Sequence, residues 1–309
     1  MTRVNWAQLP ASLRAAIERE LGDTVVDVVN AIGGFSPGFV ARLTASNGTQ
    51  QFVKAMANPG WRFLYEREAR LAPHLPDGAP FPRWRFTIDD GEWIALGFDV
   101  IDGTEATVPW SRRDIERVLV AHRTMAERLD PSPAAVERAG DMWDDWFSRW
   151  RDFARDAALA RVLPDGWTRH LDELTELEAG WPARTVGEHL VHLDLRADNV
   201  LLTRTDVYVV DWAFAARGQP WMDLVCLLPN VALRGGPDPE AQWHAHPWHA
   251  TTDPDAFDAF LAAWAGMLTH LVIATTSADL TALRELHAEH AAHARRWLAR
   301  RRGWDDCSC

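Results

Sequence analysis

The stretch GEHLVHLDLRADNVLLTRTDVYVVDWAFA, residues 187–215, contains two short runs rich in aliphatic and β-branched residues among acidic and amide side chains. The runs are residues 200–202 and 207–210, and their composition is typical of β-strands. The polar residues 203–206 between them are typical of a turn. The stretch therefore predicts a β-hairpin with polar side chains at its open end.

Two of these side chains stand at the ends of the predicted strands. If the strands pair antiparallel about the turn, Asn199 lies opposite Asp211, with Cα atoms about 4.5–5.5 Å apart. Amide and carboxylate oxygens at that separation are suitable ligands for Mg²⁺. Asp194 precedes them in an irregular loop, close enough to meet an incoming hydroxyl group beside the metal. The hairpin therefore predicts a metal site formed by Asn199 and Asp211, with Asp194 as its neighbour.

These residues resemble the catalytic loop and metal-binding segment of protein-kinase-like phosphotransferases. In that pattern His-x-Asp is followed by Asn and, after a hairpin, by a metal-binding Asp. His192, Asp194, Asn199 and Asp211 match it. The segments "VVDWA" and "GQPWMDLV" are most similar to the aminoglycoside phosphotransferase family, in which an Asp matching Asp223 buttresses the catalytic loop.

The chain departs from the family pattern at Leu193 and Asp198, where the family commonly or often has Gly. The resemblance makes Asp194 the catalytic base, and the alternative is a residue that only caps the loop. His192 is interpreted as a packed structural residue rather than a proton carrier. Arg196 either reaches the transferring phosphate or lies on the surface. Asp198 is interpreted as a turn carboxylate, with substrate or metal binding as the alternative.

A glycine-rich segment, AIGGFSPGFVARLTA, lies between two apolar runs near the N-terminus. It predicts a strand-turn-strand whose backbone N–H groups can approach phosphate closely. Ser36 and Gly38 are the candidate nucleotide-binding residues in this turn. The signal is weak alone, because glycine-rich hairpins are common.

Lys54, in the strand-like segment QQFVKAMA, is the only lysine in the chain. A single lysine among arginines suggests a place that requires a compact ammonium group. The following segment, WRFLYEREARLAPHL, predicts an amphipathic helix, and the resemblance pairs Lys54 with Glu68, or with Glu66 as second choice. By resemblance, Asp99 and Ile101 form the hinge that faces adenine.

The order of these parts implies an α+β, bilobal protein-kinase-like fold. The resemblance covers residues from about 25 to 228 and implies a nucleotide-binding lobe of residues 1–103 with a small antiparallel sheet and one key helix. Residues 104–309 would form a larger, mainly helical catalytic lobe, with a single helix predicted over residues 139–163 and a loop over 234–255. The nucleotide is expected to be ATP, with GTP not excluded.

Composition agrees with a globular protein: the chain has 309 residues, of which 47% are hydrophobic and 25% charged. No N-terminal apolar run is present, and no stretch is expected to reach membrane-spanning length, so we expect a cytoplasmic protein without a membrane partner. Cys307 and Cys309, separated by one serine, are interpreted as solvated thiols rather than a zinc site. The net charge of −12 argues against a nucleic-acid partner and favours a cationic substrate.

Two further groups are candidates for the substrate site. Asp144 and Asp145 either line a pocket for a substrate amine or form the solvated face of a helix. His244, His246 and His249, within residues 241–249, suggest a metal site. Because carboxylate and cysteine partners are not in register, a loop lining the acceptor site is the preferred interpretation.

The sequence therefore predicts an ATP-dependent, Mg²⁺-assisted kinase that phosphorylates a small-molecule hydroxyl group. An aminoglycoside or other antibiotic is the leading acceptor, and choline-like amines, homoserine and sugars are alternatives. A non-catalytic nucleotide-binding protein on the same fold is a second hypothesis. A serine hydrolase is disfavoured because no Gly-x-Ser-x-Gly motif occurs.

Overall fold

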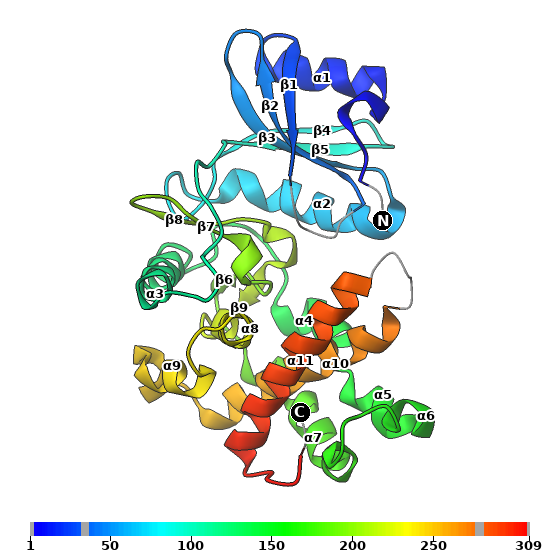
Figure 1. Cartoon of the computed structure of the whole chain (residues 1–309), viewed down its shortest axis with the longest axis vertical. Helices are drawn as coiled ribbons and strands as arrows, with labels where there is room; N and C mark the ends of the chain where they lie inside the picture. Colours follow the sequence, from blue (N-terminus) through cyan, green and yellow to red (C-terminus); the bar gives the residue numbers. More distant parts are fainter. Residues whose placement is uncertain (1–2, 32–36, 276–280, 308–309) are drawn as a thin grey trace. The chain divides into compact units, whose positions relative to one another are not determined.

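The computed structural model describes residues 3–31, 37–275 and 281–307 and divides into two compact units. Unit 1 contains most of the strands and unit 2 most of the helices (Figure 1). The predicted division between residues 103 and 104 stays a prediction. Unit 1 comprises residues 1–106, 117–128 and 198–214, and unit 2 comprises residues 107–116, 129–197 and 215–309.

In its described residues, unit 1 contains a five-stranded antiparallel sheet with the strand order β1-β2-β3-β5-β4. The central strand β3 pairs with a neighbour on both edges, which fixes where each of its side chains points. The strands are β1 (Val25–Asn30), β2 (Phe39–Ala45), β3 (Gln50–Met56), β4 (Trp84–Asp89) and β5 (Ile94–Phe98).

Successive side chains of β3 point to opposite faces of the sheet. Val53 and Ala55 belong to an apolar core that includes the buried face of α1 (Ala11–Leu21). Lys54 points to the other face, toward α2 (Pro59–Leu71). Figure 1 shows α1 and α2 on opposite sides of the sheet. The alternation of side chains along β3 therefore places apolar residues on the face toward α1 and the charged Lys54 on the face toward α2.

The predicted hairpin is present in unit 1 as β7 (Val200–Leu202) and β8 (Val207–Val209). The part of α3 (Arg112–Arg128) that belongs to this unit holds the hairpin turn. Arg117 donates from Nη2 to two carbonyl groups of the turn, at 2.7 and 2.9 Å. Short 3-10 turns complete the unit: η1 (Trp6–Gln8), η2 (Ala72–His74), η4 (Ala197–Asn199, shared with unit 2) and η5 (Trp212–Phe214).

Unit 2 is mainly helical, and α10 (Pro254–Ala274) packs against α7 (Leu171–Arg184), α8 (Met222–Leu233) and α11 (Thr281–Arg302). A two-stranded sheet joins β6 to β9. The remaining elements are α4 (Ala139–Phe147), α5 (Trp150–Arg155), α6 (Ala157–Ala160), η3 (Trp167–His170), β6 (His189–Val191), β9 (Ala216–Gly218), α9 (Pro239–Ala245) and η6 (Pro247–Ala250).

The single helix predicted over residues 139–163 is wrong, because the structure has α4, α5 and α6 there. Ser148 leaves the helical conformation at φ −82° and ψ 89°, and its hydroxyl donates to Asp144 Oδ1 at 2.6 Å. The Glu178 carboxylate, from α7, accepts the first two N–H groups of α5, each at 2.7 Å. A tertiary contact, which periodicity does not reveal, therefore starts a new helix here.

The loop predicted over residues 234–255 is also wrong, because it contains α9 and η6. Asp238 caps α9 by accepting two backbone N–H groups, and Pro239 occupies its first turn. Asp followed by Pro is a helix-start signal, and the many glycine and proline residues nearby obscured it.

The expectation that no segment reaches membrane-spanning length is wrong for α10. This helix has 21 residues and a mean hydropathy of 1.5 over its most apolar window. Among the described helices, it is the one that is long and apolar enough to cross a membrane. In the fold, 78% of that window is buried. Packing against the other helices of unit 2 accounts for an apolar composition on all sides.

Candidate active site

Lys54 lies at the centre of the candidate site in unit 1 and is 7% exposed. Its ammonium group forms an ion pair with Glu68 of α2 and lies 2.8 Å from Asp211 Oδ1. The amine therefore lies between two carboxylates that come from distant parts of the chain. This geometry agrees with the predicted pairing of Lys54 with Glu68.

The charge of Lys54 follows from its surroundings. Burial lowers the pKa of Lys54, but the negative charges of Asp211 and Glu68 together outweigh burial and raise it above its usual value. The amine stays protonated at physiological pH. A fixed ammonium group of this kind is suited to binding phosphate oxygens.

Helix α2 positions Glu68 on the sheet. Asn58 caps the helix by accepting the N–H of Gly60 at 2.9 Å, with Pro59 in the first turn. Glu66, the second-choice partner, instead pairs with Arg62 at 2.8 Å near the surface. Two residues, about half a helical turn, thus separate a partly exposed ion pair from a buried one.

The hairpin brings Asn199 and Asp211 to the same end of β7 and β8, but its register differs from the prediction by one residue. Val200 pairs with Val209, and the Asn199 carbonyl accepts the Val210 N–H at 2.9 Å. Asp211 is therefore one position beyond the residue opposite Asn199. It has a φ of 67°, and its side chain is 51% exposed. The turn consists of residues 203–206, as predicted, and pairing across these four residues places Val210 rather than Asp211 opposite Asn199.

In unit 2 the loop after β6 is supported by Asp223 of α8. Its two oxygens accept the backbone N–H groups of His192 and Leu193 at 3.0 and 2.8 Å. This contact agrees with the buttressing role implied for Asp223. His192 is fully buried, and its Nδ1 accepts the N–H of Asp194 at 3.2 Å. These hydrogen bonds agree with a packed histidine.

Leu193 explains why the family commonly has glycine at this position. Its φ is 60°, in the left-handed region that favours glycine. The side chain is 1% exposed, so its burial offsets the backbone strain. The loop therefore keeps the left-handed conformation with a different residue.

Asp194 and Arg196 form an ion pair in the same loop, with Nη1 of Arg196 2.8 Å from Asp194 Oδ1. Both side chains are partly buried, at 14% and 23% exposure. Asn230 of α8 accepts the N–H of Ala197 at 2.9 Å and so holds the far end of the loop. Sequence reasoning missed Asn230, although its spacing of two helical turns from Asp223 was available as a signal.

Cys226, between those two residues in α8, also faces the loop. Its thiol donates to the Leu193 carbonyl at 3.7 Å, and burial raises its pKa. The thiol is therefore neutral and serves packing rather than nucleophilic chemistry.

The candidate nucleotide-binding residues are only partly described. Ser36 lies outside the described residues. A Cβ on Gly38 would be 2.3 Å from the Ala55 carbonyl oxygen, so only glycine permits this close approach of β2 to β3. Asp99 and Ile101 follow β5, and Asp99 Oδ1 pairs with Arg85 at 2.5 Å.

The three acidic candidates for substrate binding are divided between the two units. Asp144 pairs with Arg151 at 3.2 Å, and the Asp145 side chain is fully exposed at the end of α4. Asp198 lies in η4, within unit 1. Their roles stay predictions.

The histidines of residues 241–249 make local contacts in unit 2. His244 pairs with Glu240 at 3.0 Å, and the His246 ring accepts the N–H of Trp248 at 3.3 Å. The rings of His244 and His249 have centroids 4.3 Å apart. In the described part of the chain, these three histidines do not form one of the groups able to hold a metal ion.

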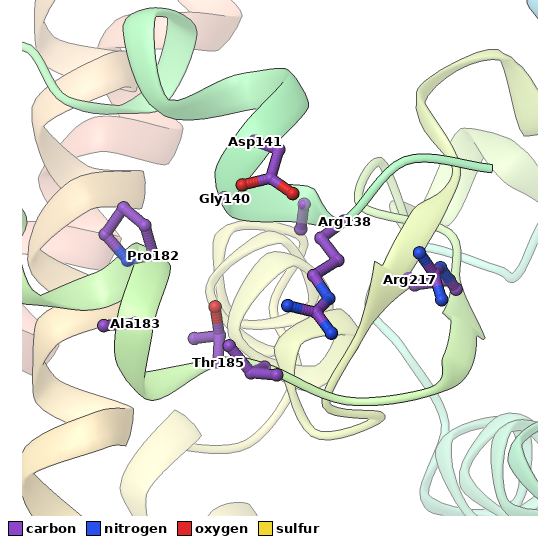
Figure 2. A pocket seen from close by; sticks show the side chains of 9 residues that line it. Arg138, Gly140, Asp141, Pro182, Ala183, Thr185 and Arg217 are labelled. Atoms are coloured by element: carbon purple, nitrogen blue, oxygen red, sulfur yellow. The ribbon is translucent and has the colours of Figure 1, made fainter.

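A pocket of about 220 Å³ lies in unit 2 among α4, the end of α7 and β9 (Figure 2). Arg138, Asp141, Thr185 and Arg217 are among the residues that line it. Both arginines pair with Glu188, at 3.9 and 2.9 Å. The pocket includes none of the predicted site residues.

A model of the phosphotransferase enzyme family matches residues 28–270. This match covers most of the chain, which therefore belongs to the phosphotransferase enzyme family. Membership makes the chain a small-molecule kinase and confirms the predicted class of enzyme. No curated protein matches the chain in sequence.

Solved structures share the fold at low sequence identity. Choline kinase LicA from Streptococcus pneumoniae has a TM-score of 0.63 at 13% identity, covering 94% of this chain and 100% of that chain. Aminoglycoside phosphotransferase APH(4)-Ia with ADP and hygromycin B has 0.58 at 13%, covering 92% and 98%. An amicoumacin kinase with AMP-PNP and Ca²⁺ has 0.52 at 13%, covering 94% and 95%. These likenesses confirm the predicted protein-kinase-like α+β fold.

Proposed function

We propose that the chain transfers the γ-phosphate of ATP to a hydroxyl group of a small molecule, with an aminoglycoside or another antibiotic as the leading acceptor. The observation that carries the proposal is the buried Lys54 ammonium group between Glu68 and Asp211. A buried cation held by carboxylates on this fold is a phosphate-binding device. Membership in the phosphotransferase family supports the same chemistry.

Each candidate residue has a role in the proposal. Lys54, oriented by Glu68, binds the nucleotide phosphates, while Ser36 and Gly38 belong to the turn that covers them. Asp194 accepts the hydroxyl proton as the acceptor oxygen bonds to the γ-phosphorus and the bond to ADP breaks. Positioning and charge neutralisation carry most of the acceleration, because phosphoryl transfer needs little covalent chemistry from the protein.

Two further contacts complete the nucleotide and phosphate site in this proposal. Arg196 contacts the transferring phosphate, for which its planar guanidinium is suited. The backbone of Asp99 and Ile101 binds adenine, as in the family.

Asn199 and Asp211 fit Mg²⁺ by their donor atoms, which are hard oxygens. The half-exposed Asp211 side chain is also within reach of an ion from solvent. When bound, Mg²⁺ supplies charge neutralisation on the nucleotide phosphates. The two residues are therefore the proposed metal ligands.

The acceptor is proposed to be cationic, because the chain has a net charge of −12. Asp144, Asp145 and Asp198 are the candidates for binding a substrate amine. Structures that share the fold include an aminoglycoside phosphotransferase with hygromycin B and a choline kinase. Choline, homoserine or a sugar is therefore the alternative acceptor, and GTP the alternative donor.

We also propose a cytoplasmic protein without membrane or nucleic-acid partners, with a nucleotide-binding lobe of residues 1–103 and a catalytic lobe of residues 104–309. The competing hypothesis is a non-catalytic protein that binds nucleotide on the same fold. The Lys54–Glu68 pair counts against it, because a buried charged pair is costly to keep without use.

Release of ADP in the presence of an acceptor panel tests the proposal. The panel contains aminoglycosides, other hydroxylated antibiotics, choline, homoserine and sugars, each with ATP or GTP and Mg²⁺. We expect acceptor-dependent ADP release that is lost in Asp194→Asn. Nucleotide binding without acceptor-dependent release across the panel would favour the non-catalytic hypothesis. A resistance screen in an antibiotic-sensitive host then identifies the acceptor.

A further inference from the structure

The segment after α11 returns to the turn that precedes α7, within unit 2. The Trp304 ring stacks on His170 with centroids 4.2 Å apart and an interplanar angle of 16°. The same ring meets Trp167 edge-on at 5.8 Å. Two aromatic contacts therefore fix the C-terminal segment beside η3.

Gly166 shows how closely the backbone of this segment packs. Its φ is 90°, and a Cβ there would be 2.2 Å from the Asp306 carbonyl oxygen and 2.9 Å from the Cα of Cys307. Any other residue would push the segment away. The positions of Asp306 and Cys307 are therefore set by backbone packing as well as by side-chain contacts.

Three side chains of different chemistry meet at this point. His170, Asp306 and Cys307 each offer one ligand atom, and these atoms all lie within 4.8 Å of one another. His170 Nε2 is 3.1 Å from Asp306 Oδ1. Ligand atoms around a tetrahedral Zn²⁺, with bonds of about 2.0–2.3 Å, are roughly 3.3–3.8 Å apart. Side-chain shifts of about 1 Å would therefore close the three groups around an ion.

We propose that His170, Asp306 and Cys307 bind a zinc ion that ties the C-terminal segment to the start of α7. A nitrogen, an oxygen and a sulfur ligand together favour Zn²⁺ over Mg²⁺, which prefers oxygen alone. On binding, the Cys307 thiol loses its proton to solvent because the thiolate is the ligand. The hydrogen bond between His170 Nε2 and Asp306 Oδ1 is replaced by a bond from each atom to the ion, with the histidine neutral and protonated on Nδ1. Water takes the fourth position of the tetrahedron, and the site uses none of the residues proposed for catalysis.

The surroundings of the three ligands suit this role. His170 Nε2 contacts one oxygen of the Asp306 carboxylate and Arg169 Nη1 contacts the other. Nη1 of Arg169 lies 2.5 Å from Asp306 Oδ2 and orients the carboxylate from outside. The Asp306 side chain is 38% exposed, so an ion can reach it from solvent.

The interpretation of Cys307 as a solvated thiol considered only its neighbours in sequence. His170 is 136 positions from Asp306, and nothing in the local pattern links them. Only the fold brings the imidazole to the cysteine.

Titration of the purified full-length chain with ZnCl₂, followed by calorimetry, tests the proposal. We expect saturable binding that Cys307→Ser and His170→Ala each weaken at least about 100-fold, as expected when a direct ligand is lost. Co²⁺ in place of Zn²⁺ should give a thiolate-to-metal charge-transfer band that is absent in Cys307→Ser. Kinase activity should not change in that variant, so failure here is distinct from failure of the proposed function.

Two control variants make the test specific. His189→Gln removes another histidine paired with a carboxylate, Asp130 at 3.3 Å, and should bind Zn²⁺ as the wild type does. Cys309→Ser removes the neighbouring thiol and should keep the charge-transfer band. Thermal melting without metal checks that each variant is folded. Absence of saturable binding to the wild type, or a band lost in Cys309→Ser but kept in Cys307→Ser, would overturn the assignment.

Discussion

The Lys54 amine lies 2.8 Å from Asp211 Oδ1, although 157 positions separate the two residues in the chain. The strand that carries Lys54 is at the centre of the sheet, and Asp211 follows the hairpin of the same unit. The Lys54 amine also pairs with Glu68. A substitution of Lys54 or Asp211 should therefore change the surroundings of the Glu68 carboxylate.

Lys54→Met should destabilise the fold by about 3–5 kcal/mol, because it leaves the buried Glu68 carboxylate without its ammonium partner. The double variant Lys54→Met/Glu68→Gln should recover much of that stability and none of the activity. Urea unfolding and nucleotide titration measure the two effects. Glu66→Gln, at a partly exposed pair in the same helix, should change stability by less than about 1 kcal/mol. A Lys54→Met protein as stable as the wild type would argue against a charged Glu68.

Leu193→Gly should cost less stability than Leu195→Gly. Both side chains are buried in the same loop, at 1% and 0% exposure. Only Leu193 has a positive φ, so glycine there relieves strain of about 1 kcal/mol while losing about 2 kcal/mol of burial. Denaturant unfolding of the two variants gives the comparison. Equal losses would mean that the left-handed conformation of Leu193 is not strained.

Asp194→Asn and Asp211→Asn should fail at different steps of the reaction. Asp194→Asn should lower kcat by about 100-fold or more and keep nucleotide binding, because only proton transfer is lost. Asp211→Asn should weaken Mg²⁺-dependent nucleotide binding, measured by calorimetry with and without the metal. Asp172→Asn, at an exposed residue with no proposed role in the site, is the control and should change neither. Loss of nucleotide binding in Asp194→Asn would contradict the base assignment.

Glu178 should make stability depend on pH between about 4.5 and 7. Burial raises the pKa of Glu178 from 4.5 to about 7. The folded state therefore binds the proton more tightly than the unfolded state does. This contribution to stability is fully present below pH 4.5, and about 3 kcal/mol of it is lost as pH rises through 7.

Glu178→Gln removes this titration and one of the two acceptors for the first N–H groups of α5. The stability gap between the wild type and the variant should be largest near pH 5 and shrink toward pH 7.5. Urea unfolding at several pH values measures it, with the exposed Glu176→Gln of the same helix as control. A constant gap across this range would place the folded pKa near its ordinary value.

Local patterns predicted most of what positions the site. The hairpin, the helix that carries Glu68 and the strand that carries Lys54 depend on short-range periodicity and turn composition, and all three are present. The predicted turn of residues 203–206 is present, but the pairing of Asn199 with Asp211 is wrong by one residue, because this four-residue turn pairs position 202 with 207 and so 199 with 210. The split of residues 139–163 failed because Glu178 caps α5 from another helix.

Long-range contacts account for the rest. Asp223 was assigned by resemblance, but Asn230 and Cys226 acquire their contacts with the loop only when α8 packs beneath it. His170 and Cys307 come together for the same reason. The helical spacing of Asn230 from Asp223 is a sequence signal for the first contact, whereas no local pattern links His170 to Cys307.

The two acceptors on α8, Asp223 and Asn230, are seven residues apart, which is a rise of about 10.5 Å along the helix. They bind the loop backbone at His192 and Leu193 near one end and at Ala197 near the other. The helix thus fixes the distance between the two ends of the loop. Insertions or deletions in that loop would break one anchor, whereas side-chain exchanges leave both intact. Variation in this loop should therefore be limited to side-chain exchanges at constant length.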